Sequence, residues 1–313
     1  MAQFANAQEA MGFVQDRTKA INATVYAVEY PEHDFASLVP TDTSAPEWST
    51  GMITYLTDYT GAAQWINGMS KDIPLADLQR GQSTVDFAMA GIGYDFNLEE
   101  INHAALQGIP LTTSKADAAR ELSMQKLYNV ALYGDPLKGM TGLLNSTAVT
   151  AGLVAQNAAA DSRLWSAKTP TEVLKDINDL LTGVYIDSNT VEMADTLLLS
   201  PERLQYLGST TMSSTNSETL LAFIMRTNIY KLTTGLELTI RAVRGLSTAG
   251  AGGTQRMCAY RRTERTVVFH LPMSPRFLPV WQNGPMNFLV PGIFRTGGTE
   301  IRRSGSVRYA DGF

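Results

Sequence analysis

The stretch "SKADAARELSMQKLYNVALYGDPLKGMTGLLN", residues 114–145, reads as a long helix followed by a glycine-rich turn. Its apolar residues recur about three or four positions apart, which is the period of one helix face. These residues are Ala116, Ala119, Leu122, Leu127, Val130 and Ala131. Gly134 is placed to end the helix, and Pro136 follows it. The pattern predicts a long helix that is capped at its start by Thr112 or Thr113.

The end of this stretch resembles a nucleotide-binding motif. Gly134, Gly139, Met140 and Thr141 spell G-x-x-x-x-G-M-T, whereas the phosphate-binding P-loop reads G-x-x-x-x-G-K-[ST]. The lysine is missing, and Lys138 lies on the wrong side of the second glycine. A P-loop also leads from a strand into a helix, so that backbone amides point at phosphate. Here the helix comes first, so we interpret the glycines as a reversal of the chain.

The composition is that of a folded protein. The chain has 313 residues, 44% of them hydrophobic and 18% charged, which is enough for one large domain or two ordinary ones. No apolar run is long enough to cross a membrane. The first 20 residues lack the basic start and apolar core of a secretory signal. We therefore expect no membrane partner and a protein that stays in the cytoplasm where it is made.

Charge is divided unevenly along the chain. Residues 226–313 carry 13 Lys/Arg against 4 Asp/Glu, a net charge of +9, and residues 1–225 carry 12 against 26, a net charge of −14. A basic half can contact nucleic acid. Alternatively, the two oppositely charged parts meet, within one chain or between copies. The basic residues are spread along the chain and form no dense block, so we favour subunit contact.

Catalytic and metal-binding patterns are missing from the sequence. Cys258 is the single cysteine, and the three histidines are far apart, so no cysteine cage or paired-histidine site is expected. Glu32, His33 and Asp34 are adjacent and would point to opposite faces of an extended chain. No G-x-S-x-G elbow occurs, and "GAGG" (250–253) lacks dinucleotide-binding spacing. Trp65, Trp165 and Trp281 are scattered, which favours packing in a core or interface over base stacking. The sequence predicts no enzyme and no cofactor.

The first half of the chain contains segments that cannot fold alone. Residues 1–50 have a short predicted helix (about 5–19) and then a proline-broken apolar stretch, which we interpret as a strap lying against another surface. Strands are predicted over 52–59 and 83–95, with a connection far longer than an ordinary hairpin loop. Such a two-stranded flap needs a partner surface. Asn97 is a predicted helix cap, with Glu99 and Glu100 in the first turn.

Residues 151–270 are predicted to form an α/β domain. "TPTEVLKDINDLLTGVY" carries a threonine cap with Pro170 at the first helical position and Glu172 nearby. "ADTLLLSPERLQYLG" predicts a buried strand and then a helix capped by Ser200. Further segments predict a helix over "NSETLLAFIMRTN", strands in "LELTIRAV" and "RMCAYRRTERTVVFHLP", and a flexible loop in "GLSTAGAGGTQR". The tail, 275–313, predicts short strands.

The ordered set of segments resembles the major capsid proteins of tailed bacteriophages with the Hong Kong 97-type fold, which is shared with encapsulin shells. The resemblance spans nearly the whole chain. It rests on "LVPTDTSAPEW" (38–48), "TGAAQWINGMSKDIPLADL" (60–78), "MAGIGYDFNLEEI" (89–101), "GDPLKGMTGLLN" (134–145), "LWSAKTPTEVLKDIN" (164–178), "TLLLSPERL" (196–204) and "FLVPGIFRTGGTEIRRSGSVRYADG" (288–312).

This resemblance implies an α+β fold with named parts. They are an N-terminal arm (1–49), an extended β-loop (50–95), a peripheral domain with a long spine helix (96–150), an axial α/β domain (151–265) and a strand-rich tail that completes the peripheral domain (266–313). The implied subunit-contact residues are Trp48 in the arm and Trp65, Asn67, Lys71 and Asp72 in the extended loop. Gly250, Gly252 and Gly253 would form a loop at the capsomer axis. The motif around Lys71 does not match the kind that forms isopeptide cross-links in some relatives.

The implied function is structural. Pentamers and hexamers of the chain would assemble into an icosahedral head enclosing double-stranded phage DNA, without a cofactor. The other partners would be scaffolding, portal and decoration proteins. The virion would be the final location, after assembly in the cytoplasm of the host bacterium. An encapsulin-type shell around cargo and an α/β enzyme are the alternatives.

Overall fold

The structure is a computed structural model that describes residues 33–65, 75–107, 111–213 and 215–313. Residues 34–313 form one unit, and the account below concerns that unit. The predicted helix over about 5–19 lies outside the described residues. So do Asn67, Lys71 and Asp72 of the predicted contact set.

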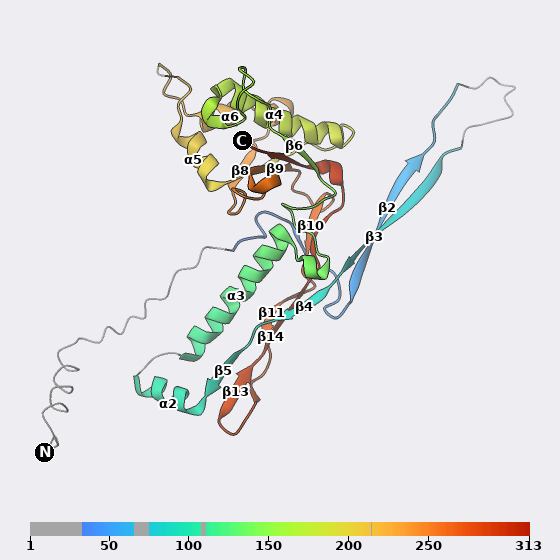
Figure 1. Ribbon diagram of the computed structural model, residues 1–313. Coiled ribbons are helices and arrows are strands. Elements are labelled where there is room, and N and C mark those ends of the chain that lie inside the picture. The colour runs from blue at the N-terminus through green and yellow to red at the C-terminus, as the bar shows by residue number, and fades with distance from the viewer. Residues whose placement is uncertain (1–32, 66–74, 108–110, 214) are drawn as a thin grey trace, which may run out of the picture. The chain divides into compact units, whose positions relative to one another are not determined.

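A five-stranded mixed sheet forms the centre of the fold (Figure 1). Its order is β6 (Thr150–Leu153), β16 (Val307–Asp311), β9 (Arg256–Tyr260), β7 (Thr196–Leu199) and β8 (Thr239–Ala242). β9 runs antiparallel to both of its neighbours, while the two outer pairs are parallel. The middle strands are buried along their whole length or nearly so, as expected for a sheet covered on both faces.

The two faces of this sheet line two separate hydrophobic cores. Alternate residues of a strand point to opposite faces, and the core clusters follow that alternation. One core receives Leu198, Cys258, Tyr260, Val307 and Tyr309. The other receives Leu197, Leu199, Met257, Ala259 and Ala310. Strands β7, β8 and β9 come from the predicted α/β region 151–270 and β6 begins one residue before it, while β16 comes from the tail. The sheet also belongs to the core that contains the long helix.

Four helices supply the second core: α4 (Pro170–Asp187), α5 (Pro201–Ser209), α6 (Leu220–Thr227) and α7 (Ile229–Thr234). Two of them, α4 and α5, begin at the predicted caps. Thr169 and Glu172 form a reciprocal capping box at α4. The Ser200 hydroxyl accepts a hydrogen bond from the Arg203 amide at α5. Each cap satisfies amides that a helix start leaves without partners.

The long helix of the opening stretch is α3 (Leu111–Tyr133). The predicted cap at Thr112 or Thr113 is wrong, because the helix has already begun at Leu111. Gly134 ends it with φ of 68°. A short 3-10 turn, η1 (Pro136–Lys138), follows. The chain then reverses, and the Leu143 and Leu144 amides donate to the carbonyls of Ala131 and Leu132. The interpretation of the glycines as a reversal is confirmed.

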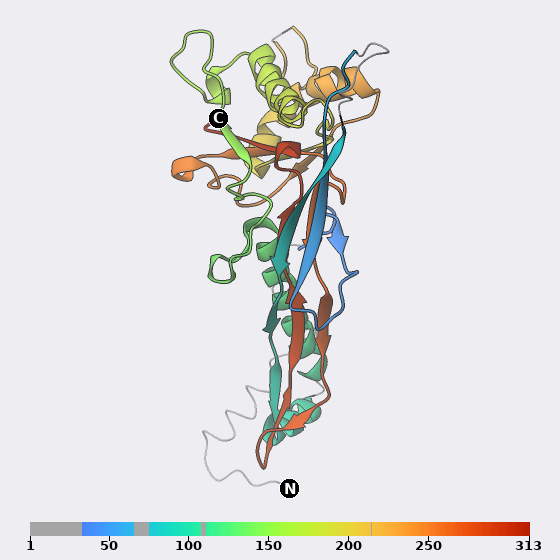
Figure 2. The same cartoon turned by 90° about the vertical axis from the view of Figure 1, so that its right-hand side faces the viewer.

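Three small three-stranded sheets combine strands from the first half of the chain with strands from its last part. The helix α3 packs against one strand of each sheet (Figures 1 and 2). The first contains β1 (Thr41–Asp42), β10 (Val267–His270) and β15 (Gly298–Ile301). The second contains β11 (Met273–Phe277), β14 (Gly292–Thr296) and β4 (Ala88–Gly91), and the third contains β12 (Trp281–Gln282), β13 (Asn287–Val290) and β5 (Tyr94–Asn97). The helix α2 (Leu98–Gln107) follows β5, and the Asn97 side chain caps it as predicted. Further 3-10 turns are η2 (Trp165–Ala167), η3 (Ala251–Gly253) and η4 (Ser304–Ser306).

The predicted flap is a hairpin of β2 (Gly51–Thr60) and β3 (Asp77–Asp86). The single strand expected over 83–95 is wrong, because those residues belong to β3, β4 and β5 in turn. A Cβ atom at Gly91 would lie 2.7 Å from the carbonyl oxygen of Gly292, and one at Gly93 would lie 2.8 Å from that of Val290. The backbones of β14 and β13 therefore pass very close to these two glycines. β4 pairs with β14, and β5 pairs with β13. The hairpin of β2 and β3 therefore ends at Asp86.

The described part of the arm packs on the chain's own core. Phe35, Leu38 and Val39 are buried there, and the Tyr260 hydroxyl donates to the Leu38 carbonyl over 2.6 Å. The predicted strap therefore lies against its own chain in this segment. The tail expected to complete the peripheral domain is divided between sheets. Its last strand, β16, joins the five-stranded sheet.

Candidate functional site

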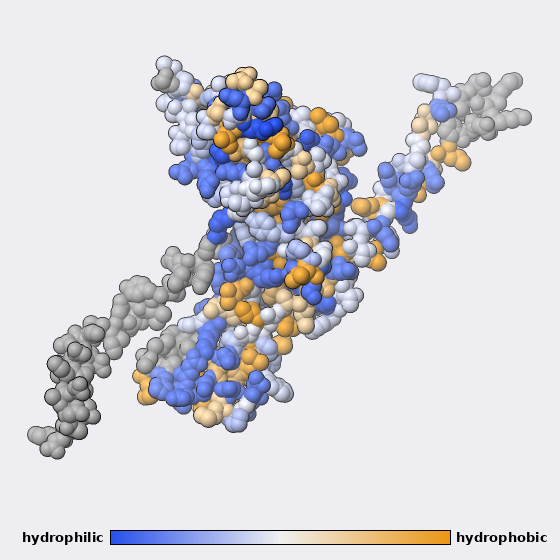
Figure 3. Space-filling model, viewed as in Figure 1, coloured by the Kyte–Doolittle hydropathy of each residue, from blue (hydrophilic) through white to orange (hydrophobic). Residues whose placement is uncertain are grey.

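In the part of the chain that the structure describes, the outer side chains of the β2–β3 hairpin are exposed and are not buried by other elements. Beyond its base, residues 55–60 and 77–82 are all exposed. Tyr55 is 69% exposed and Tyr59 is 82% exposed. Figure 3 shows hydrophobic residues spaced along this hairpin. Two strands without a covering layer are marginal in water, so the hairpin has the properties of a segment that is stabilised by a partner.

Both predicted contact tryptophans that the structure describes are exposed. Trp48 precedes the hairpin and is 64% exposed, and Trp65, five residues beyond β2, is fully exposed. Trp165, by contrast, is completely buried, with its ring 4.6 Å from that of Phe313. The scattered tryptophans therefore divide into a core residue and interface candidates.

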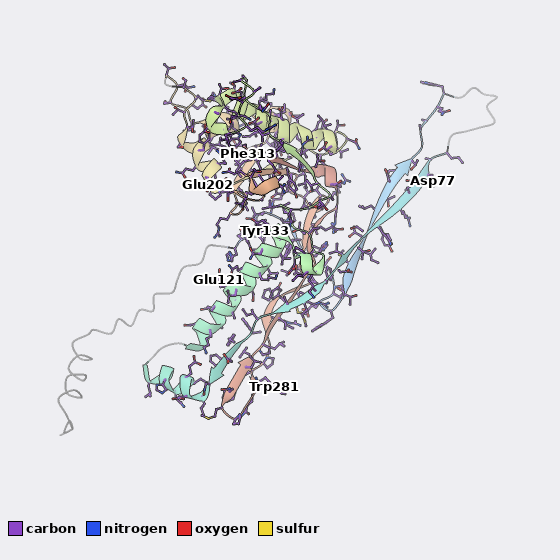
Figure 4. The ribbon with its side chains drawn as sticks, viewed as in Figure 1. Asp77, Glu121, Tyr133, Glu202, Trp281 and Phe313 are labelled. Atoms are coloured by element: carbon purple, nitrogen blue, oxygen red, sulfur yellow. The ribbon has the colours of Figure 1, made fainter. Side chains whose placement is uncertain are left out.

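A second apolar surface lies around β12, β13 and the start of α2, and we call it the distal surface. Its exposed hydrophobic residues are Leu98, Ile101, Phe277, Leu278, Val280, Trp281 and Met286. Trp281, labelled in Figure 4, is 68% exposed. The Leu98 amide donates to the Met286 carbonyl, which ties the helix start to the turn between β12 and β13. Clustered exposed apolar residues of this kind mark interaction surfaces.

The predicted axis loop is a hydrogen-bonded turn. Gly252 and Gly253 have φ of 69° and 77°, which is backbone that favours glycine. The Gly250 amide donates to the Thr254 carbonyl. The Ala251 amide donates to Asp311, a carboxylate that also binds the buried Arg256 guanidinium through two hydrogen bonds. Gly252 and Gly253 are exposed, whereas Gly250 is buried at the base of the loop.

Oppositely charged parts of the sequence meet within one chain. Arg308 pairs with Asp187 at 2.9 Å, and Arg303 pairs with Glu192 at 3.2 Å. Arg276 reaches Glu47, close to the base of the hairpin. These pairs join the basic segment 226–313 to the acidic segment before it. Part of the uneven charge is therefore explained inside the subunit.

A buried charged cluster joins the strap to the base of the hairpin. His270 Nε2 lies 3.0 Å from Glu300 Oε2, and His270 Nδ1 lies 3.5 Å from Asp42. The Arg302 guanidinium also donates to Glu300. Burial alone would raise the pKa of Glu300. Hydrogen bonds from His270, Ser83 and Arg302 outweigh burial and hold this pKa at about 2. His270 is almost wholly inaccessible, which suits a role in holding segments together.

The near P-loop residues Lys138–Thr141 line a cleft of about 370 Å³ beside Ser83–Asp86. Glu300 also lines this cleft. Asp86, Glu300 and a single lysine, Lys138, line this cleft together, and two carboxylates beside one lysine disfavour the binding of a phosphate group. Burial raises the pKa of the Cys258 thiol, so this residue behaves as a small core residue.

Within the described residues, no group of three His, Cys, Asp or Glu side chains is arranged to hold a metal ion. Among the same residues, no helix combines the length and the apolarity that a membrane crossing requires.

Sequence comparison decides the family. The family model described as "Major capsid protein" matches residues 61–313, which is most of the chain. The chain belongs to this family. No curated protein sequence matches it.

Solved structures show that this capsid protein has the Hong Kong 97-type fold that the resemblance implied. The capsid of Myoviridae phage XM1 matches with a TM-score of 0.78 at 16% identity, with 100% of each chain covered. The capsid of a native GTA particle matches with a TM-score of 0.66 at 10% identity, covering 99% of each chain. Mycobacterium phage Bobi matches with a TM-score of 0.62 at 11% identity, again over 99% of each.

Sequence reasoning missed two features of this capsid protein. The distal surface was absent from the predicted contacts, although "LPVWQNGPM" (278–286) places a tryptophan and a methionine among turn residues. The cluster of Asp42, His270 and Glu300 gave no signal, because these residues are distant in sequence and only strand pairing brings them together.

Proposed function

We propose that this capsid protein assembles through pentamers and hexamers into an icosahedral phage head that encloses double-stranded DNA. The observation that carries the proposal is the long hairpin that no other described element of the subunit covers beyond its base. Family membership adds to it. In a closed shell, copies bury each other's exposed segments through repeated contacts. This role needs no substrate chemistry, so we propose that the protein is not an enzyme.

The parts of the chain take the following roles in this proposal. Residues 1–49 form an arm, and 50–95 form an extended loop that reaches a neighbouring subunit. Residues 96–150 form a peripheral domain with α3 as its spine, 151–265 form the axial domain, and 266–313 form the strand-rich tail. Since β16 pairs with β9, the tail serves the axial sheet as well as the peripheral domain. Gly250, Gly252 and Gly253 lie at the capsomer axis.

Negative-stain electron microscopy of the purified full chain, beside its size-exclusion profile, tests the proposal. Closed shells, or free pentamers and hexamers, are the expected result. A monomer or dimer that never assembles, even when phage scaffolding and portal proteins are co-expressed, would contradict shell formation.

The contents of the particles test the proposal that the shell encloses double-stranded DNA. Particles produced in the host cytoplasm during phage growth should protect double-stranded DNA from added nuclease. Decoration proteins would bind such particles from outside. Particles that instead enclose a specific cargo protein would favour an encapsulin-type shell. Lysis of purified particles followed by gel analysis of nucleic acid and protein separates the two outcomes.

A further inference from the structure

The pairing register of the hairpin divides its side chains between two faces. Tyr55 pairs with Gln82, and Tyr59 pairs with Leu78. Directly paired residues share a face, and the next residue along each strand points to the other face. At the base, Gly51 and Asp86 lie on one face and Met52 and Val85 on the other. Beyond the base, over residues 53–60 and 77–84, the first of these faces, here called the tyrosine face, carries Ile53, Tyr55, Thr57, Tyr59, Leu78, Arg80, Gln82 and Thr84. The opposite face, called the acidic face, carries Thr54, Leu56, Asp58, Thr60, Asp77, Gln79, Gly81 and Ser83.

The two faces differ in polarity. Four large apolar or aromatic side chains lie on the tyrosine face, and each is at least half exposed. Beyond the base, the acidic face has one, Leu56, opposite the bare backbone of Gly81, while Met52 and Val85 at the base of this face are partly buried. Charge divides in the same way beyond the base, where the tyrosine face carries Arg80 and the acidic face carries Asp58 and Asp77. Asp86 lies on the tyrosine face at the base.

Burial at the base shows which face the subunit itself covers. Thr54 and Ser83, on the acidic face, are partly buried, and Ser83 lines the same cleft as the buried Glu300. Met52 and Val85, on the same face, are partly buried as well. On the tyrosine face, Gly51 is partly buried, while Ile53, Thr84 and Asp86 are exposed. The subunit's own body therefore lies on the acidic side of the hairpin, and the tyrosine face is turned away from it.

We propose that the tyrosine face is the docking face of the hairpin and that its partner is a second copy of this chain. This inference rests on the proposed shell assembly. An apolar face of this size gains free energy when it leaves water. Beyond the base of the hairpin, the charged residue of this face is Arg80, and every copy of the chain carries a net charge of −5. A second copy is therefore opposite in charge to the outer part of this face.

Site-specific photo-cross-linking in the full chain tests the proposal. The photoreactive p-benzoyl-phenylalanine replaces Tyr59 in one sample and Asp58 in the other. These positions are adjacent and lie on opposite faces. After assembly and irradiation, the Tyr59 position should give a product of twice the chain mass, with both halves identified as this chain by mass spectrometry. The Asp58 position should give at least tenfold less.

Each other outcome has a definite meaning. Equal or greater cross-linking from the Asp58 position, or none from either position in assembled shells, overturns the face assignment and leaves shell assembly standing. Cross-linking of the Tyr59 position to a different protein overturns the assignment of a second copy. A wild-type chain that forms no shells removes the proposed function itself, and this inference falls with it.

A pair of double variants gives an independent readout. Tyr55→Ser with Tyr59→Ser should reduce the yield of shells at least tenfold, while Asp58→Ser with Asp77→Ser should leave it within twofold. The side chains are exposed, so the thermal unfolding of both subunits should match that of the wild type. Equal losses of shells from both variants would overturn the assignment.

Discussion

At the scale of single residues, Glu300 makes the stability of the subunit depend on pH. Its pKa is about 2 in the folded chain against an ordinary value of 4.5. A lowered carboxylate pKa stabilises the fold above the unfolded pKa, and that stabilisation is lost as pH falls from about 4.5 toward 2. The difference corresponds to about 3 kcal/mol of unfolding free energy. Urea unfolding of the monomer between pH 6 and pH 2 should show this loss.

The variant Glu300→Gln tests the origin of the effect. It keeps the size of the side chain and removes the titrating group, so the part of the pH dependence due to Glu300 should disappear. Stability at pH 6 should also fall, because His270 and Arg302 lose a carboxylate partner. An acid branch as steep in the variant as in the wild type would contradict the assignment to Glu300.

Two glycines of the opening stretch should differ sharply in their response to alanine. A Cβ atom at Gly142 would overlap the carbonyl of Leu132, whereas one at Gly139 would meet open space. We expect Gly142→Ala to lower the unfolding free energy by about 3 kcal/mol or more through overpacking. Gly139→Ala should cost only about 1 kcal/mol for its positive φ. Denaturant titration of the two variants measures both, and equal losses would contradict this account of the turn.

At the scale of elements, two tryptophans separate assembly from folding. Trp65 beyond β2 is fully exposed and Trp165 at η2 is fully buried. Trp65→Ala should therefore change the unfolding free energy by less than about 0.5 kcal/mol but should lower the yield of shells. Trp165→Ala should cost about 3 to 5 kcal/mol in subunit stability. Thermal unfolding and electron microscopy of both variants give the comparison. An unfolded Trp65→Ala monomer would argue against an assembly role for this residue.

Local chemistry explains why some elements were predictable. The starts of α4 and α5 followed from a threonine or serine cap with proline at the first helical position. Gly134 marked the end of α3. These signals act within a few residues, so one sequence is enough to find them.

The start of β3 could not be found in this way. Both faces of the outer hairpin are exposed, so "DLQRGQ" (77–82) carries no clear alternation of apolar and polar residues. The candidate site was predictable in part.

Large apolar residues in a segment without a core of its own indicated that Trp48 and Trp65 contact a partner. The distal surface depends on β13 pairing with β5, a contact between distant segments that no local pattern contains.

At the scale of the whole molecule, the distal surface should act in assembly. Trp281→Ser replaces an exposed aromatic side chain, so subunit stability should stay within about 0.5 kcal/mol of the wild type. Shell yield should fall at least tenfold, which is about 1.4 kcal/mol of association free energy, as expected for an interface tryptophan. Leu137→Ser, at an exposed turn outside both apolar surfaces, is the control. Equal shell yields from the two variants would contradict the role of the distal surface.

The position of β16 between β6 and β9 has a consequence during protein synthesis. β6 leaves the ribosome about 150 residues before β16 does, which at bacterial translation rates is a delay of roughly 8 to 30 s. Until then the central sheet lacks a strand, and both cores lack the side chains that this strand supplies. A nascent chain therefore cannot present a finished subunit to its neighbours, and translation itself delays its entry into a growing particle.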